Sequence, residues 1–220
     1  MLGLRSCHPI SVFVERIAMD PTDHLHLTAS PHFTCVAPHT ENCMLETHDG
    51  GVSWAVLENT PGSGEGVGQY VVDSKVWLWG KFDSVFRTED AGKTWSKVSD
   101  TGGNDQIVQV KSTGTWFAPS LYGLKTSTDN TKTWQPVANG PRSEGIAVGD
   151  GMLFTSYFLN TGADAQFNPY FTTQETNATG WGNLEKSSFK YGGWLIRYDS
   201  DHHILYSTNG ESGFWRRRIK

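Results

Sequence analysis

Long apolar runs are missing from this sequence, and so is an excess of positive charge. No stretch approaches the roughly 18 apolar residues that a membrane-spanning helix needs. The 18 Lys and Arg residues are outnumbered by 23 Asp and Glu, giving a net charge of −5, whereas nucleic-acid binding requires a dense basic surface. The one basic run, residues 216–218, is short, and we expect it to be a solvated strand end. We therefore predict neither membrane insertion nor a nucleic-acid partner.

Signatures of nucleotide, nucleophile and metal chemistry are absent as well. The sequence has no Gly-Lys-Ser/Thr phosphate loop, no Gly-x-Ser-x-Gly elbow and no dinucleotide fingerprint. Five histidines cluster early in the chain without His-x₃-His or Cys-x₂-Cys spacing: His24, His26, His32, His39 and His48. We expect His24 and His26 to share one face of a strand. The spacing therefore predicts no metal site, and we expect no cofactor.

Cysteine is scarce, with only Cys7, Cys35 and Cys43 in the chain. Cys35 and Cys43 flank a segment that contains proline, and they could close a loop as a disulfide in an oxidising compartment. Three free thiols in a cytosolic protein are the alternative. The sequence leaves both open.

Glycine and tryptophan, by contrast, are abundant. The 24 Gly and nine Trp residues favour many short strands joined by tight turns. A hydrophobic content of 37% and a charged content of 19% are typical of a folded globular chain. Because all-β chains of this length often form one domain, we expect a single all-β domain over residues 1–220.

An eight-residue motif occurs three times, over residues 47–54, 88–95 and 127–134. It reads Ser/Thr-x-Asp-x-Gly-x-Ser/Thr-Trp, with Thr131 in place of the glycine in the third copy. Successive motif tryptophans lie 41 and 39 residues apart. A period near 40 is that of a propeller blade made of four short strands.

The motif has a physical rationale. Its Asp can accept backbone N–H bonds across its own turn, its Gly can adopt a positive φ, and its Trp can pack between blades. We expect structural rather than catalytic roles for Asp49, Gly51, Trp54, Asp90, Gly92, Trp95, Asp129 and Trp134.

Short β-branched or aromatic runs around the motifs complete five predicted blades. They cover residues 13–58, 69–99, 106–138, 144–186 and 192–220. In the first blade we expect the second strand over residues 25–27. The fifth blade stops after its third strand, and we expect residues 4–12 to supply the outer strand, which would remove an exposed edge. The alternatives are that the chain is a fragment of a larger propeller, or that it pairs with another copy.

The three motif copies resemble the Asp-box, or bacterial neuraminidase repeat, of the sialidase-like propeller superfamily. The resemblance implies an all-β propeller of about five four-stranded blades. The segment 201–216 is similar to uncharacterised secreted microbial members, which implies an extracellular location. One function is not implied, because this superfamily hosts unrelated activities. Residues 13–18 match the sialidase Phe/Tyr-Arg-Ile-Pro motif faintly and lack its proline, so Arg16 is the only residue carried over.

Propellers usually bind ligands at the mouth of the central channel, which is built by blade-to-blade connectors and by loops between second and third strands. Two such loops are long here, residues 30–42 and 158–168, and long loops tend to carry function. Exposed aromatic side chains near them could stack on sugar rings. We expect ligand contacts from His32, His39, Tyr157, Asp164, Tyr170 and Trp194.

Carboxylates recur where predicted inner strands begin, at Glu15, Glu65 and Glu144. A carboxylate pair about 5–10 Å apart can hydrolyse glycosidic bonds, which makes these three the candidate catalytic residues. In the alternative interpretation they are solvated turn residues or ion-pair partners of Arg16 and Arg142. Both arginines are also candidate ligand contacts.

Three functional hypotheses follow. The first is a non-catalytic module that binds a carbohydrate or another small molecule at the channel mouth. The second is an enzyme that uses the same face, either a glycosidase or lyase or a cyclase of a small secondary metabolite. The third is a scaffold that binds another protein during assembly.

Overall fold

The computed structural model describes residues 14–62, 68–81, 84–100, 107–158, 170–174, 178–184, 192–209 and 213–219, in which every regular element is a strand. The chain divides into two compact units, residues 1–100 and 101–220. The single domain expected from the sequence stays a prediction. A helix able to cross a membrane is not found in the part of the chain that the structure describes.

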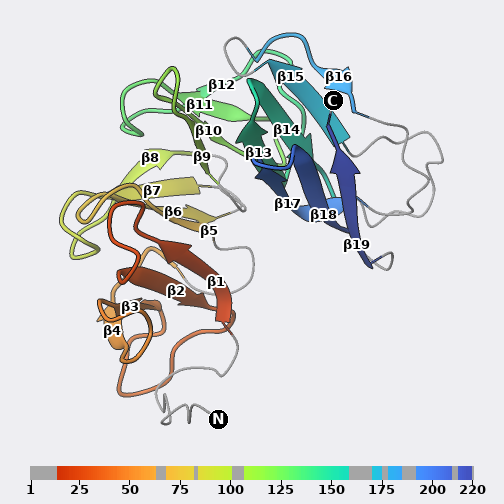
Figure 1. Ribbon diagram of the computed structural model, residues 1–220. Helices are drawn as coiled ribbons and strands as arrows, with labels where there is room; N and C mark the ends of the chain where they lie inside the picture. The colour runs from red at the N-terminus through yellow and green to blue at the C-terminus, as the bar shows by residue number, and fades with distance from the viewer. Residues whose placement is uncertain are drawn as a thin grey trace. The chain divides into compact units, whose positions relative to one another are not determined.

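The first unit holds two sheets, which are blades 1 and 2 (Figure 1). Blade 1 consists of β1 (Val14–Met19), β2 (Leu27–Pro31), β3 (Cys43–Thr47) and β4 (Ala55–Glu58). Blade 2 consists of β5 (Gly68–Val71), β6 (Trp77–Lys81), β7 (Ser84–Thr88) and β8 (Ser96–Ser99). Each sheet is an antiparallel meander in chain order, and the inner strands β1 and β5 contact each other.

The second unit holds three sheets. Blade 3 consists of β9 (Val108–Val110), β10 (Thr115–Ala118), β11 (Lys125–Ser127) and β12 (Gln135–Pro136). Blade 4 consists of β13 (Gly145–Gly149), β14 (Met152–Ser156), β15 (Tyr170–Gln174) and β16 (Gly182–Asn183). Blade 5 has three strands among the described residues, β17 (Gly193–Asp199), β18 (Ile204–Asn209) and β19 (Gly213–Arg218). The inner strand β13 contacts both β9 and β17.

Five antiparallel meanders confirm the predicted fold class, an all-β propeller with five blades. Four of them have four strands and the fifth has three among the described residues. The segment expected to supply its outer strand, residues 4–12, lies outside the described residues.

The second strand of blade 2 is buried on both faces, so it is a near-continuous apolar run rather than an alternating one. In β6, Trp77, Leu78 and Trp79 are all at most 1% exposed. Trp77 and Trp79 pack with Met44 of blade 1. Removing a buried aromatic side chain of this kind typically costs about 3–5 kcal/mol, so these residues hold the first unit together.

The three motif copies form turns with nearly the same hydrogen bonds, and we call residues 47–54, 88–95 and 127–134 the box turns. In the first, the Asp49 carboxylate accepts bonds from the Ser53 backbone N–H (2.9 Å), the Ser53 hydroxyl (2.6 Å) and the Thr47 hydroxyl (2.7 Å). The Thr47 oxygen in turn accepts the Gly51 N–H at 3.0 Å. The polar groups of the Asp and Ser/Thr positions are therefore satisfied within the turn.

The third box turn keeps this arrangement although it lacks the glycine. Thr131 has a φ of 67°, and its N–H still donates to the Ser127 oxygen at 3.0 Å. The threonine thus adopts the left-handed backbone that glycine supplies in the other two copies, which have φ values of 92° and 79°.

One strand prediction in blade 1 was wrong. The second strand runs over Leu27–Pro31, not over residues 25–27. His24 and His26 therefore do not share a strand face, because both precede β2. His24 is exposed in the preceding turn, whereas His26 is 2% exposed.

Candidate functional site

Each sheet has two ends, and those predicted site residues that the structure describes lie at one of them. We call this the connector end: inner strands begin there, second strands end there and third strands begin there. Glu15 lies near the start of β1 and Glu144 immediately precedes β13. The box turns follow the third strands, so in each blade they lie at the opposite end.

In blade 1 the connector end holds a carboxylate–imidazole pair. Glu15 Oε2 lies 2.5 Å from His32 Nδ1, and the two side chains are 13% and 22% exposed. Because a carboxylate only accepts, Nδ1 is the donor. Phe33, which is 58% exposed, meets the His32 ring edge-on at 4.5 Å between centroids. The arrangement places a polar pair beside an exposed aromatic ring.

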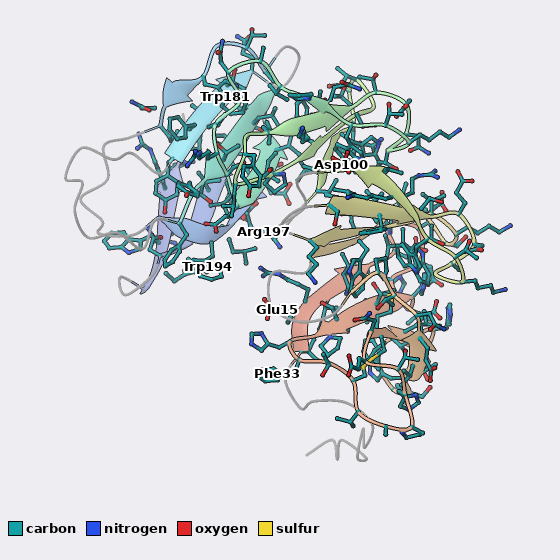
Figure 2. All side chains as sticks on the ribbon, turned by 180° about the vertical axis from the view of Figure 1, so that it is seen from behind. Glu15, Phe33, Asp100, Trp181, Trp194 and Arg197 are labelled. Atoms are coloured by element: carbon teal, nitrogen blue, oxygen red, sulfur yellow. A yellow bond between two sulfur atoms is a disulfide. The ribbon has the colours of Figure 1, made fainter. Side chains whose placement is uncertain are left out.

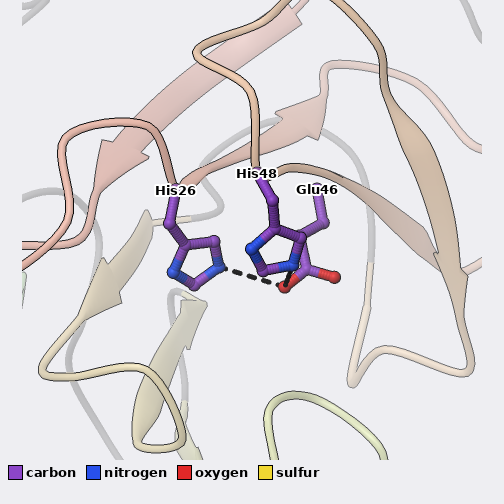
Figure 3. A group of neighbouring side chains, drawn as sticks. All are labelled: His26, Glu46 and His48. Carbon is purple, nitrogen blue, oxygen red and sulfur yellow. Dashed lines mark hydrogen bonds and ion pairs between the residues drawn. The ribbon is translucent and has the colours of Figure 1, made fainter.

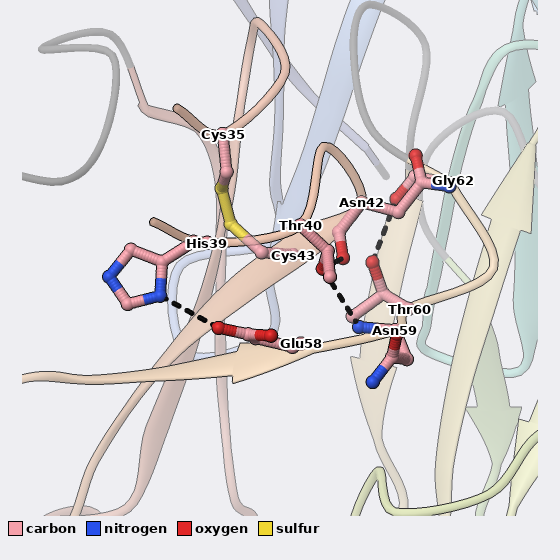
Figure 4. Close-up of a disulfide and its surroundings, with 9 residues drawn as sticks. All are labelled: Cys35, His39, Thr40, Asn42, Cys43, Glu58, Asn59, Thr60 and Gly62. Atoms are coloured by element: carbon pink, nitrogen blue, oxygen red, sulfur yellow. Dashed lines mark hydrogen bonds and ion pairs between the residues drawn. A yellow bond between two sulfur atoms is a disulfide. The ribbon is translucent and has the colours of Figure 1, made fainter. Parts of the chain in front are cut away.

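The loop that follows β2 is fastened at several points (Figure 4). Cys35 and Cys43 form a disulfide, as one of the two alternatives left open by the sequence has it, while the compartment stays a prediction. His39 Nδ1 lies 2.9 Å from Glu58 Oε1 at the end of β4. His39, a predicted ligand contact, is therefore engaged in holding this loop to the sheet. Cys7 lies outside the described residues.

Arg16 lies one residue beyond Glu15 and serves the packing of blade 1 on blade 2. Its backbone oxygen accepts a hydrogen bond from Gln69 Nε2 at 3.3 Å, and the same nitrogen donates to the Thr28 oxygen at 2.7 Å. These bonds link β1 and β2 to β5, so the backbone at Arg16 is fixed within the first unit.

In the second unit, Glu144 is tied into the connector end of blade 4. Its Oε2 accepts the Phe158 backbone N–H at 2.7 Å, and its own N–H donates to the Ser156 oxygen at 2.8 Å. Burial raises the pKa of Glu144, and the hydrogen bond from Phe158 offsets part of that rise. The carboxyl group is therefore half-buried and held in one orientation.

Trp194 joins this group from blade 5 (Figure 2). The backbone of β17 is irregular between Gly193 and Ile196, and Trp194 lies in that irregularity. Its indole is 42% exposed and contacts the Phe158 ring at 4.8 Å between centroids. Glu144, Phe158 and Trp194 thus form one continuous surface, which we call the Trp194 platform. Phe158 was missed by the sequence analysis.

Tyr170 is the first residue of β15 and so lies at the connector end of blade 4, but its side chain is buried. Its hydroxyl lies 2.7 Å from Ser207 Oγ and accepts a bond from Asn209 Nδ2 at 2.6 Å. Burial raises the pKa of Tyr170, while these two bonds act in the opposite direction. With 7% of its surface exposed, Tyr170 joins blade 4 to blade 5 through its hydroxyl.

The remaining predicted residues are distributed as follows. Tyr157 is half-buried at the end of β14, and Arg142 is exposed before β13. Glu65 and Asp164 lie outside the described residues. Glu15 belongs to the first unit and Glu144 to the second, so the carboxylate pair stays a prediction.

A shallow hollow lies on the face of blade 5 that is turned away from blade 4. Its volume is about 230 Å³, and it is lined by Leu195, Arg197, Tyr206, Thr208 and Phe214. Stacked Tyr206 and Phe214 rings, with centroids 5.6 Å apart, form part of its wall. Ile196, between Leu195 and Arg197, points to the opposite face and packs in the core shared with blade 4.

Three polar side chains of blade 1, His26, Glu46 and His48, lie together next to the first box turn. Their potential ligand atoms all fall within 4.8 Å of one another. Among the described residues they are the group of histidine, cysteine and acidic side chains that could hold a metal ion. This cluster was not predicted from the sequence, because His26 precedes β2 whereas Glu46 and His48 lie at the end of β3 and in the turn after it.

No family model matches the chain, and no curated protein matches it. Solved propeller structures do. An ancestral GH74 enzyme is 15% identical with a TM-score of 0.62, over 94% of this chain and 33% of its own. The GH74 xyloglucanase from Xanthomonas campestris is 17% identical with a TM-score of 0.63, over 92% of this chain and 38% of its own. YCF48 bound to D1 peptide is 15% identical with a TM-score of 0.61, over 94% of this chain and 66% of its own.

The chain thus spans about a third of the length of the GH74 enzymes and about two thirds of that YCF48 chain. At these identities the likeness concerns the fold alone. It supports the β-propeller fold and leaves the Asp-box likeness to sialidases as a resemblance. This chain is similar to the propellers of GH74 enzymes and of YCF48.

Proposed function

We propose that this protein is a non-catalytic binding propeller that recognises a carbohydrate at the connector end of blades 4 and 5. The observation that carries the proposal is the Trp194 platform, in which a 42% exposed indole is held against Phe158 beside the half-buried carboxyl of Glu144.

The platform offers the two kinds of contact that a sugar needs. An aromatic face packs against the apolar C–H side of a pyranose ring, and it is presented here with little conformational freedom because Phe158 supports it. A carboxylate can accept several hydrogen bonds, so the single bond from Phe158 leaves acceptor capacity for sugar hydroxyls. Few polar groups beside an aromatic surface are typical of small-molecule sites.

The distribution of carboxylates favours binding over hydrolysis. Glycosidases use two carboxyl groups about 5–10 Å apart. In the described part of the second unit, Glu144 is the one acidic residue at a connector end, since Asp129 lies in a box turn and Asp150, Asp199 and Asp201 lie in or beside the turns that follow inner strands. The platform therefore has one carboxyl group where that mechanism needs two.

The test is glycan-array binding by the full chain and by two matched tryptophan variants. Trp194→Ala is expected to lose about 10-fold or more in affinity, equivalent to about 1.4 kcal/mol, because it removes the stacking surface. Trp215→Ala is the control: Trp215 is 46% exposed but lies on the outermost described strand of blade 5. Absence of glycan binding, or equal affinity of Trp194→Ala and the unaltered chain, would overturn the proposal. Sugar release that disappears in Glu144→Gln would instead establish an enzyme.

Peptide binding is the second candidate, and the match to YCF48 bound to D1 peptide favours it. This candidate predicts that a peptide library, and not a glycan array, yields binders. If a bound peptide is displaced by no sugar and its affinity falls in Trp194→Ala, the platform recognises peptide.

A further inference from the structure

The pairing of β2 with β3 brings His26, Glu46 and His48 together on one face of blade 1. Leu27 pairs with Thr47, and Thr28 pairs with Glu46. One step beyond the paired residues, His26 is therefore opposite His48. Because side chains alternate along a strand, Glu46 and His48 point to the same face.

The side-chain geometry agrees with this register (Figure 3). Glu46 Oε1 lies 3.0 Å from His26 Nε2 and 3.1 Å from His48 Nε2. The two imidazole rings are stacked, with centroids 4.6 Å apart and an angle of 8° between their planes. Both imidazole nitrogens thus lie within hydrogen-bond distance of the same carboxylate oxygen. Because each nitrogen lone pair lies in its own ring plane and the two planes are nearly parallel, the exposed His48 ring has to turn before it can share an ion with His26.

A second, buried carboxylate fixes the orientation of His26. Asp20 Oδ2 lies 3.0 Å from His26 Nδ1, and both residues are at most 2% exposed. Asp20 is itself held by the backbone N–H of Thr22 at 2.8 Å and by its hydroxyl at 2.7 Å. A carboxylate on the far nitrogen of a histidine is the usual outer partner of a metal-binding imidazole, because it directs the other nitrogen toward the ion.

The contacts of His26 leave a position that a cation can occupy. Both nitrogens of His26 face a carboxylate oxygen, and a carboxylate only accepts. A proton or a cation must therefore lie between His26 Nε2 and Glu46 Oε1: the proton can belong to the imidazole or to the carboxyl group, and a metal ion can replace it. A tetrahedral Zn²⁺ with bonds of about 2.0–2.1 Å places neighbouring ligand atoms about 3.3 Å apart, close to the 3.0 and 3.1 Å that separate Glu46 Oε1 from the two imidazole nitrogens.

We propose that His26 Nε2, His48 Nε2 and Glu46 Oε1 bind one Zn²⁺ ion, with water as the fourth ligand. Two histidines and one glutamate are a known ligand set for zinc, and the borderline-soft imidazoles select against Mg²⁺ and Ca²⁺. The side chain of His48 is 68% exposed, so the ion has a path from solvent. The bound ion connects the start of β2 to the first box turn and would stabilise blade 1.

The experiment is calorimetric titration of the tag-free, chelator-treated full chain with ZnCl₂. We expect one ion per chain, a rise in the midpoint of thermal unfolding when Zn²⁺ is added, and visible d–d absorption of a tetrahedral site when Co²⁺ replaces Zn²⁺. His48→Gln and Glu46→Gln are expected to weaken binding by at least the roughly 10–100-fold that loss of an outer partner causes.

His24→Gln is the matched control, because His24 is an exposed histidine just before the same strand and is not in the cluster. It should bind Zn²⁺ like the unaltered chain. Circular dichroism establishes that each variant is folded, which His48→Gln should be because the side chain is largely exposed. The proposal is overturned if the unaltered chain binds no Zn²⁺, or if the double variant His48→Gln/Glu46→Gln binds it unchanged. In the first case a proton between His26 Nε2 and Glu46 Oε1 accounts for the cluster.

Discussion

The hydroxyl of Tyr170 offers a sharp test of how blades 4 and 5 are joined. Tyr170 begins β15, whereas Ser207 and Asn209 belong to β18. The three residues are 7%, 7% and 5% exposed. Because water does not reach these groups, a bond that is lost here cannot be replaced by solvent. The substitution Tyr170→Phe removes the hydroxyl and leaves the ring in place.

The size of the effect follows from the partners that remain. Asn209 Nδ2 loses its bond of 2.6 Å to the phenol, and Ser207 Oγ loses one of 2.7 Å. Among the described residues, Asn209 Oδ1 already has no hydrogen-bond partner. Leaving a buried donor unsatisfied costs about 1–3 kcal/mol, so we expect Tyr170→Phe to lower the free energy of unfolding by that amount. For a chain of this size, the midpoint of thermal unfolding should fall by about 2–12 °C.

Urea unfolding measures the change, with an unchanged dependence on urea concentration as evidence that the unfolded state is the same. Tyr122→Phe is the matched control: Tyr122 is 73% exposed, and its substitution should change stability by less than about 0.5 kcal/mol. A double-mutant cycle with Ser207→Ala isolates the pair, and the second substitution should cost less once the first is present.

Two results would refute this account. In one, Tyr170→Phe is no more destabilising than Tyr122→Phe. In the other, Tyr170→Phe and Ser207→Ala add within about 0.3–0.5 kcal/mol, as distant and independent sites do. Either result would mean that the Tyr170 hydroxyl contributes little to joining the blades, and that its predicted contact with a ligand remains to be tested.

The box turns provide two further predictions. The Thr94 hydroxyl and N–H lower the pKa of Asp90 to about 2, and those of Thr133 do the same for Asp129. Both pKa values lie below that of an Asp in the unfolded chain, so the turns contribute stability that is full above about pH 4 and is lost as the pH falls toward about 2. Denaturant midpoints across this range should therefore drop less in Asp90→Asn/Asp129→Asn than in the unaltered chain. An equal drop would contradict the assignment of this acid sensitivity to the two box-turn carboxylates. Gly92→Ala should lower the free energy of unfolding, measured with denaturant, by about 1–3 kcal/mol more than Gly51→Ala does. Both glycines have a positive φ, but only at Gly92 would a Cβ lie 2.8 Å from a buried tryptophan ring. Equal losses would show that backbone strain, not crowding, requires the glycine.

The fold was predictable because the box turn is a local structure. Thr47, Asp49 and Ser53 satisfy one another within seven residues of chain. Such a turn requires the same residue types wherever it occurs, so it can be recognised in the sequence. The spacing of about 40 residues between copies then indicates a propeller blade. The third copy shows the limit of the pattern, since Thr131 adopts a φ of 67° without glycine and no residue in the sequence indicates this.

The candidate site was predictable in part, and the missing part depends on contacts between blades. Trp194 was expected to contact a ligand, but its support, Phe158, was not identified. The irregularity in β17 places Trp194 next to Phe158, just beyond the end of β14. This contact between two blades cannot be predicted from the sequence of either blade alone. Tyr170 was expected at the surface for the same reason: its burial depends on Asn209 and Ser207 of the next blade.

The histidine–glutamate cluster of blade 1 shows how an error in the bounds of one strand conceals a site. A second strand over residues 25–27 would put His26 in the middle of the strand. In the structure β2 begins at Leu27, so His26 immediately precedes the strand and lies opposite His48. The pairing register decides which side chains meet across two strands, because a shift of the register by one residue moves every side chain to the other face. Spacing along the chain therefore does not show which residue of the neighbouring strand His26 faces. The usable signal was the box turn itself. Once it fixes Thr47 as the last residue of β3, alternation places Glu46 and His48 together, and the antiparallel partner needs only one histidine at its start to complete the ligand set.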